Sequence, residues 1–240
     1  MEKRKKRAFR WHLPHGKLGD CVCAFYLLEN VGRMQNCTHL ITCHRLAHKV
    51  AKLFHFHHIS LTNEGGREAI NMHWLSYVYE TPYFVTGILK ATQDCFGLKP
   101  ELCKSLTPTI TAKDTEDVTL VQLDGRTHKG IGAPMALSEK KQAIKTLAKY
   151  PAEVIGGPDT KPYLGDKFKY RVGSLRAITG ELLKCRQFLG CDSGLSHLAG
   201  ALGVPSAVVI SKVNDELLDL YRSYRNTRTY QLLPRMVKLL

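Results

Sequence analysis

The fold of this chain is decided by the stretch "CDSGLSHLAGALGVPSAVV", Cys191–Val209. Asp192 and Ser193 are residues whose side chains cap the first turn of a helix, and the apolar run behind them has helical spacing. That run stops at Gly203, which is followed closely by a proline, and this combination ends helices. A valine-rich segment comes next. The stretch therefore predicts a turn, a helix and a buried strand in direct succession.

The rest of the second half repeats this alternation of strands and helices. Strands are expected at residues 118–125, 152–157, 169–174, 187–192 and 206–211, and helices at residues 137–150, 174–185, 194–203 and 214–224. Short buried strands that alternate with helices indicate an α/β domain built on a parallel sheet.

The first half follows the same pattern less regularly. Strands are expected at residues 7–13, 38–44 and 58–63, and helices from Asp20 onward and at residues 45–54. Residues 65–96 give no clear pattern, and residues 98–117 hold two prolines and mixed charge, as a linker does. We therefore predict two α/β domains, residues 1–112 and residues 113–240.

The composition is that of a globular protein with a large positive charge. The 240 residues are 44% hydrophobic and carry a formal net charge of +14. Such a charge favours an anionic partner, for example nucleic acid, a phosphorylated glycan or a nucleotide. No apolar run reaches the roughly 18 residues of a membrane-spanning helix, and the basic N-terminus lacks the apolar segment of a signal peptide. We expect a cytoplasmic protein, in the host cytoplasm if the source is a virus; a peripheral membrane location stays open.

The cysteines and histidines do not predict a metal site. Eight cysteines are scattered without a Cys-x-x-Cys pair, which indicates buried free thiols. Histidines and cysteines are dense between Cys37 and His58, but their spacing matches no common zinc pattern. Whether this cluster binds a metal stays open, and no residue is assigned as a metal ligand.

Asp20 is the first residue that could carry chemistry. It lies in "HGKLGDCVCAFYLL", His15–Leu28, where Gly16 and Gly19 let the backbone turn tightly before a helix. One interpretation is that Asp20 is the N-cap of that helix. The other is that the positive end of the helix dipole keeps Asp20 ionised, as a general base requires.

The turn in the opening stretch also has two interpretations. A helix that begins near Gly194 points its free backbone N–H groups outward, and such a terminus binds phosphate well. Alternatively, Ser193 or Asp192 simply caps the helix, and His197 is a hydrogen-bonded core residue. Because ligands bind outside the carboxyl ends of strands in open α/β sheets, both this turn and the Asp20 turn lie where a site is expected.

Taken together, the two turns resemble one family. "KLGDCVCAFYLLENV", Lys17–Val31, resembles the N-terminal motif of heptosyltransferase-like glycosyltransferases (glycosyltransferase family 9), and "FLGCDSGLSHLAGALGVPSAVV", Phe188–Val209, resembles the signature of that family. The resemblance implies a GT-B architecture, in which two Rossmann-like parallel-sheet domains face a cleft. The N-terminal domain, which is compact here, would bind the acceptor, and the C-terminal domain would bind a nucleotide-diphosphate sugar.

The resemblance also implies roles for single residues. Asp20 would be the general base of an inverting transfer, with Lys17 and Gly19 on the acceptor side. The residues that it assigns to the donor are Arg126, Thr127, Lys129, Asp159, Asp192, Ser193, Gly194, Leu195 and His197. Among these, Ser193–Leu195 would contact the diphosphate, Arg126 or Lys129 would neutralise the leaving group, and Asp159 would bind the ribose.

The expected chemistry needs no metal and no cofactor beyond the nucleotide sugar. The chain has no Asp-x-Asp motif of the kind that holds a metal-bound nucleotide sugar. Three functions stay open. The first is sugar transfer to an anionic surface glycan of the lipopolysaccharide type, and the second is transfer to nucleic acid, for example a hydroxymethylated base in viral DNA. The third is a nucleotide-binding protein without catalysis. No oligomeric state is predicted.

Overall fold

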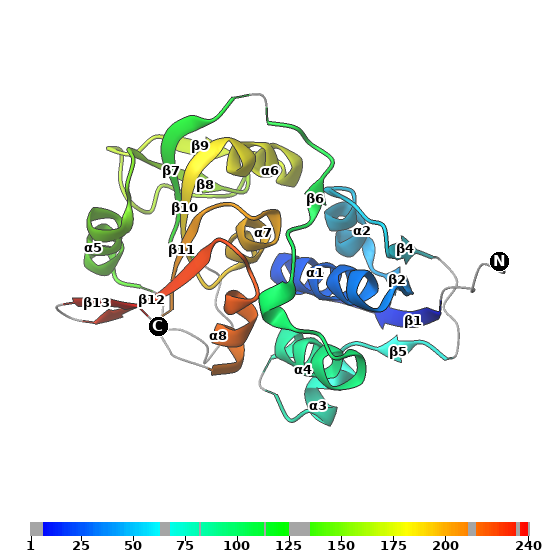
Figure 1. Cartoon of the computed structure of the whole chain (residues 1–240). Coiled ribbons are helices and arrows are strands. Elements are labelled where there is room, and N and C mark those ends of the chain that lie inside the picture. Colours follow the sequence, from blue (N-terminus) through cyan, green and yellow to red (C-terminus); the bar gives the residue numbers. More distant parts are fainter. Residues whose placement is uncertain are drawn as a thin grey trace. The chain divides into compact units, whose positions relative to one another are not determined.

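The structure is a computed structural model of the chain. It describes residues 7–62, 68–81, 83–112, 114–124, 135–210, 215–233 and 236–239. The chain divides into two compact units, Met1–Thr109 and Ile110–Leu240 (Figure 1). Each unit is described by itself below. None of the helices in the described ranges is long and apolar enough to cross a membrane.

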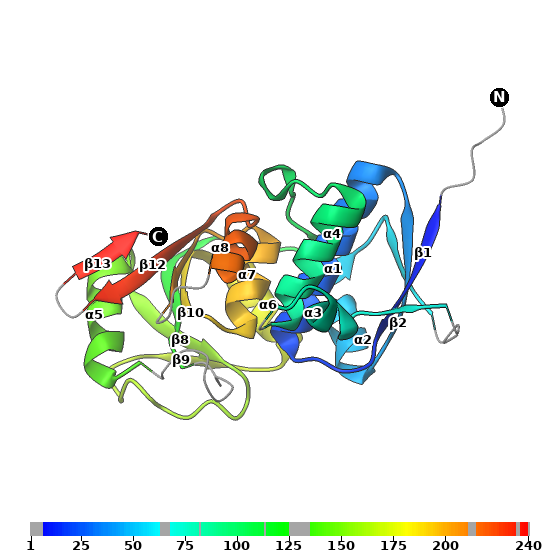
Figure 2. The ribbon, with the colours of Figure 1, turned by 90° about the horizontal axis from the view of Figure 1, so that it is seen from below.

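Unit 1 (Met1–Thr109) is built on a parallel sheet of four short strands, in the order β4-β2-β1-β5. Its elements are β1 (Ala8–Leu13), α1 (Leu18–Gln35), β2 (Thr38–Cys43), α2 (Arg45–Ala51), β3 (Phe54–His55), β4 (Ile59–Leu61), β5 (Ile70–Asn71), α3 (Trp74–Val78), α4 (Phe84–Phe96), a short 3-10 helix (Pro100–Leu102) and β6 (Thr107–Pro108). Helices α1 and α4 pack against each other and lie side by side in Figure 2. Strands β3 and β6 form a separate antiparallel pair.

A buried tryptophan fixes the centre of the unit 1 sheet. Trp11 on β1 is 1% exposed, and its indole Nε1–H donates a hydrogen bond to Nδ1 of His39 on β2 over 2.9 Å. Burial lowers the pKa of His39 to about 4, so the ring is neutral and can accept this bond. The bond therefore satisfies a polar group that an apolar core would otherwise leave unpaired.

Unit 2 (Ile110–Leu240) has a seven-stranded sheet in the order β13-β12-β11-β10-β7-β8-β9. Its elements are β7 (Glu116–Gln122), α5 (Leu137–Leu147), β8 (Ala152–Gly156), β9 (Tyr170–Val172), α6 (Leu175–Lys184), β10 (Cys185–Cys191), α7 (Gly194–Leu202), β11 (Ser206–Val209), α8 (Asp215–Arg222), β12 (Thr227–Leu233) and β13 (Met236–Leu239). Every neighbouring pair is parallel except the β12–β13 hairpin, which is red in Figure 1. The predicted α/β class with parallel sheets is confirmed.

A close contact between α7 and Tyr224 gives a stability prediction. A Cβ atom on Gly200 would lie 2.6 Å from two ring carbons of Tyr224, which is 1% exposed. We expect Gly200→Ala to lower the free energy of unfolding by about 1–3 kcal/mol, because the ring has no room to move away. Gly180→Ala on α6 is the matched control, since its Cβ would meet nothing within 4 Å; it should raise stability by about 0.5–1 kcal/mol. Urea unfolding measures both, and equal effects would contradict the packing of α7.

Candidate active site

The turn between β10 and α7 lies at the carboxyl edge of the unit 2 sheet. Ser193 is the N-cap of α7, and its Oγ accepts a hydrogen bond from the backbone N–H of Ser196 over 3.4 Å. The same hydroxyl donates to Oε1 of Gln122 over 2.7 Å, which ties the turn to the last residue of β7. A Cβ on Gly190 would lie 2.3 Å from the Ser196 hydroxyl, so the glycine lets α7 begin directly above β10.

The first turn of α7 leaves backbone donors open. Gly194 and Leu195 are the first two residues of the helix, whose N–H groups have no partner within it. Neither N–H group finds an acceptor elsewhere in the described part of the chain. Because the Ser193 side chain is engaged with Gln122 and Ser196, this residue has only its backbone to offer a ligand. Two open N–H groups at the positive end of a helix form a site for an anion such as a diphosphate.

Asp192 and His197 belong to a network of contacts that links this turn to α8. Oδ1 of Asp192 accepts a hydrogen bond from the Tyr221 hydroxyl over 2.8 Å and lies 3.5 Å from Nε2 of His197. The other ring nitrogen of His197 lies 3.1 Å from the Tyr224 hydroxyl, and its ring stacks on Tyr221. Burial opposes the ionisation of Asp192, but the bonds from His197 and Tyr221 outweigh it and hold its pKa below the ordinary value. This network fixes α8 against the turn.

The other predicted donor residues are spread over neighbouring strand ends. Asp159 is exposed in the turn after β8, where the side chain of Thr160 packs over Gly156. At the end of β7, Lys140 of α5 donates to Oδ1 of Asp124 over 3.2 Å. Arg126, Thr127 and Lys129 lie outside the described residues. Their roles, like that of Asp159, stay predictions.

Asp20 lies at the carboxyl edge of the unit 1 sheet, but it is not the N-cap of its helix. Helix α1 begins at Leu18, two residues before the predicted start, and Lys17 is the N-cap. Oδ2 of Asp20 accepts a hydrogen bond from the Lys17 backbone N–H over 2.7 Å, so the carboxylate caps the helix from its third position. Oδ1 has no hydrogen-bond donor among the described residues. Asp20 is thus both a capping residue and a half-exposed carboxylate, while the acceptor role of Lys17 and Gly19 stays a prediction.

Three histidines near Asp20 were missed as a site by sequence reasoning. His15 follows β1, His44 follows β2, and His73 follows β5. A position just beyond the end of a strand is a signal in the sequence for a site residue. Strand β5 could not be predicted, however, so His73 could not be placed at a strand end. The rest of the Cys37–His58 cluster is spread over the start and end of β2, helix α2, strand β3 and the β3–β4 turn. No group of three or more metal-ligating side chains is found among the described residues.

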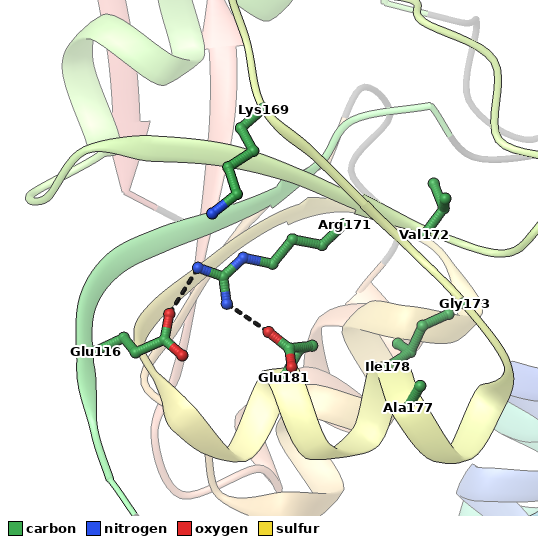
Figure 3. Close-up of a pocket in the computed structure, with 8 residues that line it drawn as sticks. All are labelled: Glu116, Lys169, Arg171, Val172, Gly173, Ala177, Ile178 and Glu181. Atoms are coloured by element: carbon green, nitrogen blue, oxygen red, sulfur yellow. Dashed lines mark hydrogen bonds and ion pairs between the residues drawn. The ribbon is translucent and has the colours of Figure 1, made fainter.

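A hollow of about 420 Å³ in unit 2 lies away from the strand ends that hold the donor residues (Figure 3). At its centre is Arg171 of β9, which forms ion pairs with Glu116, Glu153 and Glu181. Glu116 is the first residue of β7, so the hollow borders the opposite end of that strand from Gln122. Since three carboxylates already neutralise Arg171, the hollow offers no free cation at this position to a phosphate.

This ion-pair cluster predicts a pH-dependent stability. The bond from Arg171 lowers the pKa of Glu116, and it lowers the pKa of Glu153 against the effect of burial. Carboxylates with a lowered pKa contribute stability above their ordinary pKa, and this contribution is lost as the pH falls through the folded-state value. Arg171→Met should therefore cost about 1–2 kcal/mol at pH 7, with allowance for solvent screening of these half-exposed groups.

The same comparison at low pH is the test of the cluster. In urea unfolding, the difference between Arg171→Met and the wild type should shrink as the pH falls below the ordinary pKa of glutamate and through the lowered folded-state pKa values of Glu116 and Glu153. Arg176→Met is the control, because Arg176 on α6 is exposed and has no ion pair among the described residues. A stability difference for Arg171→Met that does not change with pH would show that the pairs contribute nothing.

Comparisons with known proteins identify the fold. No protein-family model matches the sequence, and no curated sequence is significantly similar to it. Among solved structures, a family 9 glycosyltransferase from Veillonella parvula aligns over 97% of this chain and 87% of its own, with a TM-score of 0.60 and 12% identity. The heptosyltransferase WaaC of E. coli, solved with ADP, aligns over 94% of each chain, with a TM-score of 0.60 and 10% identity.

A third similar structure is larger. TibC, an iron-containing dodecameric heptosyltransferase solved with ADP-D-β-D-heptose, aligns over 90% of this chain with a TM-score of 0.56 and 16% identity. The alignment covers 62% of the TibC chain, so this protein spans less than two thirds of that length. At these identities the likeness establishes the fold. The chain therefore has the GT-B-like fold of heptosyltransferases that the two sequence motifs predict.

Proposed function

We propose that this protein is an inverting, metal-independent glycosyltransferase that uses a nucleotide-diphosphate sugar. The observation that carries the proposal is the start of α7, where the N–H groups of Gly194 and Leu195 have no acceptor among the described residues. This anion site lies at the carboxyl edge of the sheet, where α/β proteins bind nucleotides. WaaC and TibC, which share the fold, were solved with ADP and with ADP-D-β-D-heptose.

The proposed reaction is a single displacement. The acceptor hydroxyl gives its proton to Asp20, and its oxygen attacks the anomeric carbon of the sugar. The bond between that carbon and the diphosphate oxygen breaks on the opposite side, and the nucleoside diphosphate leaves. Negative charge therefore grows on the diphosphate, where the first turn of α7 stabilises it. Arg126 and Lys129 are assigned the same task in place of a metal ion, and no cofactor is proposed.

The proposed acceptor is an anionic surface glycan of the lipopolysaccharide type. Its support is the formal net charge of +14, which attracts phosphorylated or carboxylated acceptors. Nucleic acid has the same attraction to this charge. An experiment must therefore distinguish a glycan acceptor from a nucleic acid acceptor.

The test is a donor panel with detection by mass. The protein is incubated in EDTA with each nucleotide-diphosphate sugar and either a phosphorylated lipid-linked glycan or duplex DNA that contains hydroxymethylated bases. The proposal predicts that one donor adds a single sugar to the glycan. A mass gain on the DNA alone would show that nucleic acid is the acceptor in place of the glycan, and the proposed reaction would stand. Tight nucleotide binding without mass gain on any acceptor would instead indicate a nucleotide-binding protein without catalysis.

A further inference from the structure

The three histidines of unit 1 come together because of the sheet topology. Strands β2, β1 and β5 are neighbours and run parallel, so their carboxyl ends share one edge. His44 directly follows β2, while His15 and His73 each come two residues after β1 and β5. Asp20, in the first turn of α1, lies at the same edge. Four titratable side chains from distant parts of the chain are thus placed around one point.

Two of the imidazoles form a stack. The rings of His15 and His73 have centroids 3.5 Å apart and planes 22° apart, and His73 stacks in turn on Phe84, with centroids 4.2 Å apart. Nε2 of His73 lies 2.9 Å from the backbone oxygen of His15. Because a carbonyl oxygen can only accept, Nε2 carries a proton and donates it. The remaining nitrogen, Nδ1, is the ring nitrogen that this bond does not use.

The third imidazole lies beside Asp20, next to Gly16. This glycine has φ +155°, and a Cβ on it would lie 3.1 Å from Cβ of Asp20, 3.6 Å from Oδ2 of Asp20 and 3.7 Å from Nε2 of His44. The His44 imidazole and the Asp20 carboxylate are therefore close to one position of the backbone, and the glycine leaves no side chain between them.

The charges around His44 do not balance when the imidazoles are protonated. Burial lowers the pKa of His44, and repulsion from its neighbours His15, His48 and His73 lowers it further. The carboxylate of Asp20 acts in the opposite direction. The Cys21 thiol, 3.6 Å from Nε2 of His44, adds no negative charge at neutral pH, because burial and Asp20 raise its pKa to about 12.

We propose that His15, His44 and His73 form an anion subsite beside Asp20, which binds a phosphate or carboxylate group and holds it more tightly as the pH falls. The bound anion supplies the negative charge that one carboxylate cannot supply to several imidazolium rings. This subsite rests on the proposed function only where the acceptor is named as the source of the anion. An acceptor held by its anionic group at this subsite would have its reacting hydroxyl next to Asp20. Binding of the anion itself does not depend on sugar transfer.

The linkage between binding and protonation sets the expected size of the effect. An anion favours the charged form of each imidazole, so it raises the histidine pKa values and is bound with uptake of protons. A rise of one unit in a single histidine pKa corresponds to about a tenfold difference in affinity between low and high pH. Two imidazoles that respond together would give a larger difference.

The test uses inorganic phosphate and the imidazole signals of the whole protein in NMR. At pH 6 phosphate should shift the signals of His15, His44 and His73, with a Kd about tenfold lower than at pH 8. The signals are assigned by single substitutions. His55→Gln is the control, because His55 is exposed on β3 and is not one of the three histidines of the proposed subsite. Phosphate that binds at the α7 turn is recognised separately, because it shifts the signal of His197.

Variants and a second anion make the outcome decisive. His44→Gln combined with His73→Gln should lose the pH-dependent binding, while His55→Gln should retain it. Acetate in place of phosphate shows whether a carboxylate is accepted as well. Wild-type signals that do not respond to either anion at pH 6, or a response that survives the double substitution, would overturn the proposal. Neither result depends on activity, so failure here is distinct from failure of the glycosyltransferase proposal.

Discussion

Asp20→Asn is expected to lower kcat for sugar transfer about a thousandfold and to leave the donor Kd unchanged. General bases contribute about 10²–10⁴-fold to the rate, and an amide cannot take the proton of the acceptor hydroxyl. The fold should survive, because the Asn side-chain oxygen can still accept the N–H of Lys17 that Oδ2 accepts in the wild type. Steady-state rates with the donor that emerges from the panel, together with calorimetry of donor binding, measure both quantities.

A matched carboxylate separates catalysis from a general loss of charge. Asp94→Asn makes the same change on α4, where the side chain is exposed in the same unit. It should change kcat less than twofold, since surface substitutions away from a site have small effects. If Asp20→Asn turned over at the rate of Asp94→Asn, Asp20 would be a capping residue alone, and the proton would have to go elsewhere.

Gly194→Pro is expected to weaken nucleoside diphosphate binding by about ten- to a hundredfold. A hydrogen bond to a charged group contributes about 1.5–3 kcal/mol, and proline removes one N–H from the proposed diphosphate site. The helix should tolerate the change, because Gly194 is its first residue, where proline is favoured. Ser193 before it is already extended, with φ −158° and ψ 166°, as a residue that precedes proline must be.

Gly194→Ala is the control for this variant. It adds a Cβ but keeps the N–H group, so nucleotide affinity should stay closer to that of the wild type. Calorimetry with ADP, UDP and GDP measures the three proteins, and urea unfolding checks that the proline variant is folded. Equal affinities for the proline and alanine variants would mean that the Gly194 N–H does not hold the diphosphate.

The fold of unit 2 was largely predictable because local signals and tertiary structure agree there. The Ser174 N-cap is confirmed, since its side chain accepts the N–H of Ala177 over 3.3 Å, and α6 and α7 begin within one residue of the predicted positions. The two C-terminal strands escaped prediction. Thr227–Leu233 pairs with β11, the strand that precedes it across α8, and no local pattern predicts that pairing.

Unit 1 was less predictable because its strands β3 to β6 have only two or three residues each and its site depends on strand pairing. β5 has two residues, and its place beside β1 follows from contacts between residues 59 positions apart, as in the Trp11–Ile70 pair. Periodicity cannot reveal a strand of that length. This limits what could be predicted of the site. The neighbouring glycines and the helix start indicate Asp20, whereas His73 lies near Asp20 only because β5 pairs with β1.

Sugar transfer is measured most directly by phosphorus NMR of a nucleotide-diphosphate sugar with the protein, in EDTA and with an anionic glycan acceptor. We expect the diphosphate diester signals to be replaced by those of a free nucleoside diphosphate, and only when the acceptor is present. The same conversion should fail with Asp20→Asn, although the donor signals still broaden on binding. Donor signals that broaden with the wild type but never convert, for any nucleotide sugar and acceptor, would show that the protein binds nucleotides without transferring sugar.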